Sequence, residues 1–241
     1  PFEWCVVPAG KVTLEPHGYR TGYLKFPLTF EVPEFEISRF PITNAQFDAF
    51  VSSEDGWCDR SWWDFSQNAK IWREENDTPA PGRLAECGNC PRTNLSWYSA
   101  IAFALWLSAK TGEDVMLPNE QQWQRAAQGD DGRIYPWGDK WDGNLCNHSV
   151  APYTSQNTST VTHYYEGASP FGVLDMSGNV WEWCLTDINT GNVQLAGANF
   201  RVLRGGAFYV NDLEYIQTTV RNGNIPSSQN EVSGFRLVRF S

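Results

Sequence analysis

The fold of this chain is decided by residues 174–183, which read LDMSGNVWEW. This mixture of aromatic and small residues recurs along the chain, which holds 12 Trp, 14 Phe and 9 Tyr against 2 Met, with 20 Gly and 14 Pro. Each buried Trp or Phe removes roughly 150 to 250 Å² from water, so aromatic anchors can hold an irregular domain together. We therefore expect more than half of the chain to lie outside helices and strands.

Length and charge restrict the class of protein. The chain has 241 residues, which suits one domain spanning residues 1–241. With 18 basic and 28 acidic residues the formal net charge is −10, and this field repels a phosphate backbone or an anionic bilayer. The sequence also lacks an apolar run of about 18 residues that would span a membrane. We therefore expect neither nucleic-acid binding nor membrane insertion.

The start of the chain bears on its origin. Pro1 is followed by residues that lack the basic and apolar pattern of a signal peptide. We interpret the chain as an excised domain or a processed product, which leaves room for a fused upstream domain. A cytoplasmic location is expected, with surface display as the alternative if an upstream segment is missing.

Three short amphipathic helices are predicted from their caps and apolar spacing. Their N-caps are Thr43 or Asn44, Ser96, and Asn119. Gly112 ends the second helix, and Gln122 completes a capping box in the third. Short strands are predicted at residues 202–203, 208–210 and 235–238, because these apolar segments lie close to Gly or Asn.

Further motifs lie on both sides of residues 174–183. They are FPITN at 40–44, LPNEQQW at 117–123, YPWG at 135–138, RVLRGGAF at 201–208 and GFRLVR at 234–239. In this order they resemble the formylglycine-generating enzyme (sulfatase-modifying factor) family over essentially the whole chain. The resemblance implies a single α+β domain with the C-type-lectin-like fold of that family and little regular secondary structure.

The catalytic cysteines of the family do not carry over to this chain. Family enzymes bind copper through two cysteines shortly after the Gly-Gly pair, and alignment from Gly206 places these positions on Val210 and Tyr215. Neither residue supplies a thiolate for a soft metal. A second branch of the family uses iron held by histidines, and this chain has only His17, His148 and His163, with no pair at ligand spacing on one helix. We therefore expect no catalysis.

Cys87 and Cys90 form the one close pair among six cysteines. A C-x-x-C pair can be half of a zinc site, a redox pair or two loop thiols. The sequence offers neither a second pair at zinc spacing nor a nearby histidine, and so we predict loop thiols.

The resemblance also implies a structural calcium ion. Its ligands would be the carboxylates of Asp175 and Glu182 and the backbone carbonyls of Gly178 and Val180. Such hard oxygen donors suit calcium. The alternative is that Glu182 pairs with a buried arginine.

The C-terminal segment 221–236 reads RNGNIPSSQNEVSGFR. It resembles the variable region of proteins diversified by diversity-generating retroelements, whose Asn-rich frame it matches at Arg221, Asn222, Asn224, Pro226, Asn230 and Gly234-Phe235-Arg236. Loops on a rigid scaffold often carry recognition, and Tyr with small polar residues suits an adaptable binding surface. Family members that are not diversified have similar C-termini, so both interpretations stay open.

We therefore predict a non-catalytic protein that binds an unknown ligand, expected to be a protein, through residues 207–233. The predicted contact residues are Tyr209, Val210, Asn211, Leu213, Tyr215, Gln217, Thr219, Asn222, Gly223, Asn224, Ile225, Ser228, Asn230, Glu231 and Val232. One alternative is a divergent formylglycine-generating-type or iron-dependent oxidase with a deep metal pocket near Val210 and Tyr215. Another is a regulatory module fused to a kinase or protease.

Overall fold

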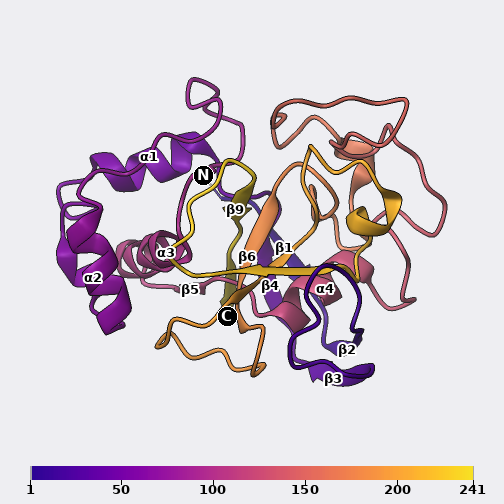
Figure 1. The fold of residues 1–241 in the computed structure, drawn as a ribbon, viewed down its shortest axis with the longest axis horizontal. Coiled ribbons are helices and arrows are strands. Elements are labelled where there is room, and N and C mark those ends of the chain that lie inside the picture. The colour runs from indigo at the N-terminus through magenta and orange to yellow at the C-terminus, as the bar shows by residue number, and fades with distance from the viewer. Residues whose placement is uncertain (1, 241) are drawn as a thin grey trace.

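The computed structural model describes residues 2–240 and has a mixed α+β architecture, as predicted (Figure 1). The helices are α1 (Asn44–Ser52), α2 (Gln67–Glu75), α3 (Trp97–Thr111) and α4 (Glu120–Gln128), with 3-10 turns η1 (Arg60–Trp63), η2 (Tyr165–Gly167) and η3 (Leu213–Ile216). The strands are β1 (Trp4–Val7), β2 (Gly10–Leu14), β3 (Leu28–Val32), β4 (Phe35–Ser38), β5 (Asp114–Met116), β6 (Trp181–Asp187), β7 (Arg201–Arg204), β8 (Arg221–Asn224), β9 (Ser233–Phe235) and β10 (Val238–Phe240). Most residues lie outside these elements, as expected from the sequence.

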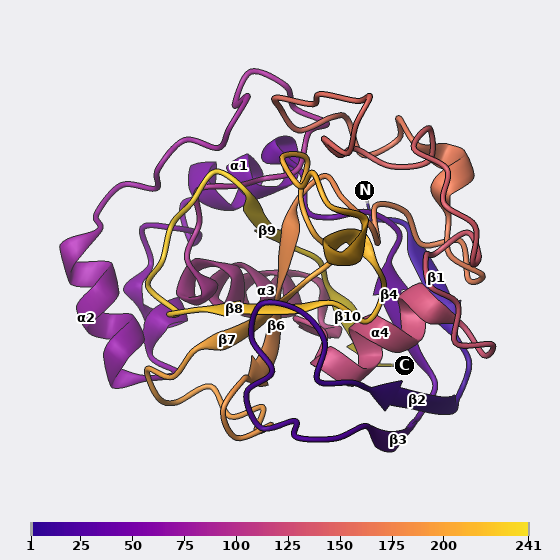
Figure 2. The same ribbon diagram turned by 45° about the vertical axis from the view of Figure 1, so that its right-hand side comes forward.

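The strands form two small sheets and a hairpin. The first sheet has the order β1-β4-β10-β5 with antiparallel neighbours, and β2 pairs with β3 in the separate hairpin. The second sheet has the order β8-β7-β6-β9, in which only the β6–β9 pair is parallel. Figures 1 and 2 show α1, α2 and α3 on one side of the molecule and α4 with the hairpin on the other. In the second sheet β8 is an edge strand, and its outer side pairs with no named strand of the described chain but forms an isolated bridge between Arg221 and Gly18.

The three predicted helices are confirmed with their caps. Thr43 and Asn119 each accept a bond from the amide three residues later, and Gln46 and Gln122 complete the capping boxes. Ser96 caps α3, which ends at Gly112 with φ of 73°. Within residues 2–240, no helix has both the length and the apolar character needed to cross a membrane.

Two of the three strand predictions need correction. The strand predicted at 202–203 is β7, but residues 208–210 form turns rather than a strand. The strand predicted at 235–238 is divided, because β9 ends at Phe235 and pairs with β6, whereas β10 begins at Val238 and pairs with β4 and β5. The chain passes from one sheet to the other between them. Helix α2, capped by Ser66, was not predicted.

Aromatic rings join the helices to the sheets in the core. Phe47 of α1 stacks on Phe103 of α3 with ring centroids 5.6 Å apart. Phe103 in turn meets Phe235 of β9 at 5.5 Å. Trp123, Trp181 and Trp183 are also buried. Much of the aromatic excess therefore stabilises the core.

Candidate functional site

The main chain of the predicted binding segment is fixed from outside the segment. Strand β8 pairs with β7 along its length. Beyond it, the carbonyls of Pro226, Asn230 and Val232 accept bonds of 3.0, 2.9 and 2.8 Å from the amides of Trp97, Asn94 and Trp181. These are bonds between backbone groups, so they persist when the side chains of the segment change. Side-chain bonds inside the segment are local, such as the 3.0 Å bond from Asn224 to Ser228.

A buried ion-pair network lies beneath this surface. Glu120, at the start of α4, accepts bonds of 2.5 and 2.8 Å from Arg221 of β8 and one of 3.2 Å from Arg204 of β7. All three side chains are fully buried. Burial lowers the pKa of Arg204 to about 10, and the Glu120 carboxylate opposes that shift. The network ties β8 to α4 and β7, so the edge strand is firmly placed.

The structure places most of the predicted contact residues at the surface. The exposed ones are Tyr209, Asn211, Ile225 and Glu231, and the half-buried ones are Leu213, Tyr215, Gln217, Thr219, Asn222, Asn224, Ser228, Asn230 and Val232. On β8 the side chains alternate, with Asn222 and Asn224 outward and Arg221 inward. Substitutions at the outward positions therefore disturb the packing of the core least.

Val210 and Gly223 were predicted to contact ligand and are instead buried. Val210 is 3% exposed and packs with Cys146 and Ile216 in a small apolar cluster. Gly223 lies where a Cβ atom would come within 2.8 Å of Ile188 Cδ1 and 3.1 Å of the Arg201 carbonyl oxygen. Both positions therefore belong to the scaffold rather than to the contact surface.

Tyr19 is a surface residue that the sequence did not reveal. It is 50% exposed and stacks on Tyr215 with ring centroids 4.0 Å apart and planes 16° apart. Its edge meets Trp181 at 6.1 Å, and the Trp181 indole N–H donates to the Tyr209 hydroxyl at 3.3 Å. Tyr209 is 45% exposed. We call Tyr19, Tyr209 and Tyr215 the tyrosine face.

The N-terminal loop reaches this face through backbone bonds to β8. The amide of Arg221 donates to the His17 carbonyl at 2.9 Å, and Gly18 forms a bridge with Arg221. Nothing in the sequence of residues 17–20 signals this contact, because the two segments lie about 200 residues apart.

Gln217 and Thr219 line a pocket beside the tyrosine face. The pocket has a volume of about 570 Å³, and its walls also include Glu15, His17, Gln128 and Arg133. His17 Nδ1 lies 2.8 Å from the Thr219 hydroxyl, and His17 Nε2 lies 3.4 Å from the Glu214 carboxylate. The histidine therefore lies between Thr219 of the pocket wall and Glu214, the residue before Tyr215.

The carboxylate of Glu182 does not fit the calcium site that the resemblance implies. Arg236 donates to both of its oxygens, at 2.6 and 2.8 Å, and the Trp123 indole N–H donates at 2.6 Å. All of these groups are buried. The geometry is that of the alternative, a glutamate paired with a buried arginine, and it leaves Glu182 poorly placed to coordinate a cation. Calcium binding stays an untested prediction, and the pairing of Glu182 with Arg236 does not favour it.

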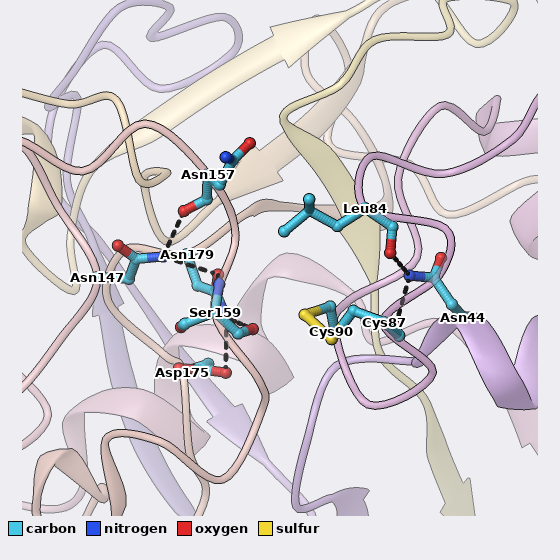
Figure 3. The surroundings of a disulfide bond; sticks show 9 residues. All are labelled: Asn44, Leu84, Cys87, Cys90, Asn147, Asn157, Ser159, Asp175 and Asn179. Carbon is cyan, nitrogen blue, oxygen red and sulfur yellow. Dashed lines mark hydrogen bonds between the residues drawn. A yellow bond between two sulfur atoms is a disulfide. The ribbon is translucent and has the colours of Figure 1, made fainter.

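The other three residues predicted to bind calcium lie near Glu182 in the chain. Asp175 is buried with φ of 57°, and its carboxylate accepts a 3.0 Å hydrogen bond from the side-chain amide of Asn179 (Figure 3). Burial raises its pKa to about 7, against the opposing effect of that bond. The amide of Gly178 donates to the Gly205 carbonyl at 2.7 Å, and Val180 is buried. Among residues 2–240, no group of three or more His, Cys, Asp or Glu is placed to hold a metal ion.

Cys87 and Cys90, predicted to be loop thiols, instead form a disulfide (Figure 3). A turn with a 3.1 Å bond from the Cys90 amide to the Cys87 carbonyl brings their Cα atoms to 5.4 Å, within the range for a disulfide. The Asn44 side chain donates to the carbonyls of Leu84 and Cys87 at 3.1 and 3.0 Å. The disulfide closes this short loop, and the bonds from Asn44 hold the loop against the start of α1.

The positions aligned with the catalytic cysteines are part of a packed cluster. Val210 and Tyr215 pack with Ile216 and the buried thiol of Cys146. Burial raises the pKa of Cys146, with the nearby Asp175 adding to the rise. A raised pKa opposes the thiolate form that a soft metal requires.

Comparison with known proteins identifies the family. The family described as "Sulfatase-modifying factor enzyme 1-like domain" matches residues 3–240. Hercynine oxygenase of Mycobacterium tuberculosis is 28% identical over 86% of this chain and 53% of its own length. The inactive C-alpha-formylglycine-generating enzyme 2 of Mus musculus is 28% identical over 85% of this chain and 75% of its own length. This chain spans about half the length of some relatives, including the mycobacterial one.

A solved structure shows the same fold. Treponema denticola variable protein 1 superposes with a TM-score of 0.69 over 99% of this chain and 95% of its own, at 21% identity. The fold expected from the motifs is therefore confirmed. The chain belongs to the sulfatase-modifying factor enzyme 1-like domain family.

Proposed function

We propose that this chain is a non-catalytic ligand-binding protein whose tyrosine face and outward β8–β9 residues recognise a partner protein. One observation carries the proposal: backbone bonds and the buried Glu120 network hold the segment, and its exposed side chains, apart from Glu231, which pairs with Arg83, are left out of that support. A surface of this kind accepts changes of side chain while its main chain stays fixed. Exposed tyrosines with small polar neighbours suit adaptable recognition.

The absence of thiolates at Val210 and Tyr215 supports a non-catalytic role. The mouse relative, which is 28% identical to this chain, is itself named an inactive enzyme. The fold shared with a protein named a variable protein is compatible with diversification of residues 207–233. The relatives also include enzymes, so the oxidase alternative requires its own test.

Two displayed libraries test the surface. The first randomises the outward residues Asn222 and Ile225, and the matched control randomises two buried residues, Val220 and Gly223. We expect most clones of the first library and few of the control to resist proteolysis. Selection of the first library on a fixed folded protein such as lysozyme should then yield binders. A collapse of folding in the first library comparable to the control would contradict the proposal.

Elemental analysis and an oxidation assay test the oxidase alternative. Purified protein should contain no stoichiometric copper or iron and should leave a cysteine-containing sulfatase peptide unoxidised. A redox metal with turnover would establish the enzyme instead. Diversification itself is tested in the genome, where we expect a neighbouring reverse transcriptase and an Asn-codon-rich near copy of residues 221–236.

A further inference from the structure

The tyrosine face is bordered by carboxylates that lack basic partners. Asp212 and Glu214 are exposed on and beside η3, and Glu15 is exposed on the wall of the adjoining pocket. Within residues 2–240, no Lys or Arg forms an ion pair with any of the three; Glu214 faces only His17, which is charged only when protonated. This side of the molecule therefore presents aromatic rings together with uncompensated negative charge.

The nearby arginines are already engaged. Arg133, on the pocket wall, donates to Asp131 at 2.9 and 2.7 Å and to the Pro136 carbonyl at 3.1 Å. Arg20 lies over the ring of Phe200 at 4.4 Å, and Arg83 pairs with Glu231. None of these side chains neutralises Asp212, Glu214 or Glu15.

Elsewhere in the chain, the same combination of ring and carboxylate holds an arginine. Arg239 lies over Trp4 at 4.7 Å and donates to Glu36 at 2.7 Å. Arg92 lies over Phe47 at 4.6 Å and donates to Asp48 at 2.9 Å. The tyrosine face has the same two components, aromatic rings and carboxylates. Among the described residues, no lysine or arginine forms an ion pair with these carboxylates.

We propose that the partner presents arginine or lysine side chains to this surface, with a cation against the exposed tyrosine rings and carboxylates on either side. The inference rests on the proposed binding function and specifies the chemistry of the partner as a basic protein segment. Cations are attracted both to the faces of tyrosine rings and to carboxylates. Burial raises the pKa of Tyr19, and the carboxylate of Asp212 adds to the rise, so Asp212 lies close enough to act on this ring.

Phage-displayed random 12-residue peptides, selected on the immobilised protein, test this inference. Enriched peptides should be rich in arginine and lysine. In titrations of a soluble enriched peptide, replacing its key arginine by citrulline should weaken binding about tenfold, and so should Tyr19→Ala or Tyr209→Ala in the protein. The double variant Asp212→Asn with Glu214→Gln should weaken binding and reduce its sensitivity to salt, because salt screens exposed charges.

Tyr165→Ala and Glu166→Gln are the matched controls, because they remove an exposed tyrosine and an exposed glutamate outside the surface. They should leave peptide affinity unchanged, and melting curves should show that every variant folds. If binding depends on Tyr19 and Tyr209 but selects peptides without basic residues, the cationic partner is wrong and the binding function stands. If no peptide binds in a manner that depends on these tyrosines, both the inference and the proposed surface are overturned.

Discussion

Buried ion pairs of two glutamates stabilise the fold. Glu120 and Glu182 each pair with arginines that are remote in sequence, and all of these side chains are fully buried. Removing one partner of such a pair leaves an uncompensated buried charge, which typically costs about 3 to 5 kcal/mol. Asp175 differs, because it is buried with an amide partner rather than a paired arginine.

Asp175 should make the stability of the protein depend on pH. Its pKa in the folded state is about 7, raised by burial, whereas an aspartate in an unfolded chain titrates near pH ~3.9. Between these values the folded state binds a proton that the unfolded state lacks, so the free energy of unfolding falls as pH rises from about 4 to 7. Asp175→Asn removes this loss, and Asn tolerates the positive φ of the position.

We expect Asp175→Asn to be more stable than the wild type by about 4 kcal/mol at pH 8, falling to about 1.5 kcal/mol at pH 5. Urea denaturation at both pH values measures the difference, with the exposed Asp114→Asn as control. A difference between Asp175→Asn and the wild type that does not change with pH would show that the carboxyl group is charged in the folded state throughout.

At the scale of elements, local signals were predictable and long-range pairings were not. Helix caps depend on bonds across three residues, and Thr43, Ser96 and Asn119 therefore identified three helices correctly. The division of residues 233–240 between two sheets depends on β4, β5 and β6, which are distant in sequence. No local pattern in that segment marks the point of division.

The alternation of outward and buried residues along strand β8 predicts a contrast in stability between substitutions at neighbouring positions. Asn222→Ala should change the free energy of unfolding by less than about 0.5 kcal/mol, as expected of surface positions. Gly223→Ala should cost about 1 to 3 kcal/mol, because its methyl group meets Ile188 and the Arg201 carbonyl and overpacks the site. Chemical denaturation of both variants measures this contrast. Equal costs would mean that β8 does not separate a contact side from a scaffold side.

At the scale of the whole molecule, the sequence indicated the C-terminal part of the candidate surface but not the residues that the N-terminal loop adds to it. Tyr209 and Tyr215 lie in the segment that the motifs indicated, whereas Tyr19 and Glu15 reach it from the N-terminal loop. Only the folded chain brings the two ends together, through the bond from Arg221 to His17. The burial of Val210 likewise depends on Cys146, which lies far away in the sequence.

The whole molecule should not depend on calcium for its stability. The centre where calcium was predicted is held by the Glu182–Arg236 pair, so the glutamate already has its charge compensated. A structural site present at 100 times its dissociation constant would contribute about 2.7 kcal/mol, or roughly 5 to 10 °C in melting temperature for a chain of this size. We expect EDTA to shift the melting temperature by less than about 1 °C. A larger fall that calcium reverses and magnesium does not would show that the ion binds through other oxygens, and Asp175→Asn would then identify whether that carboxylate is among them.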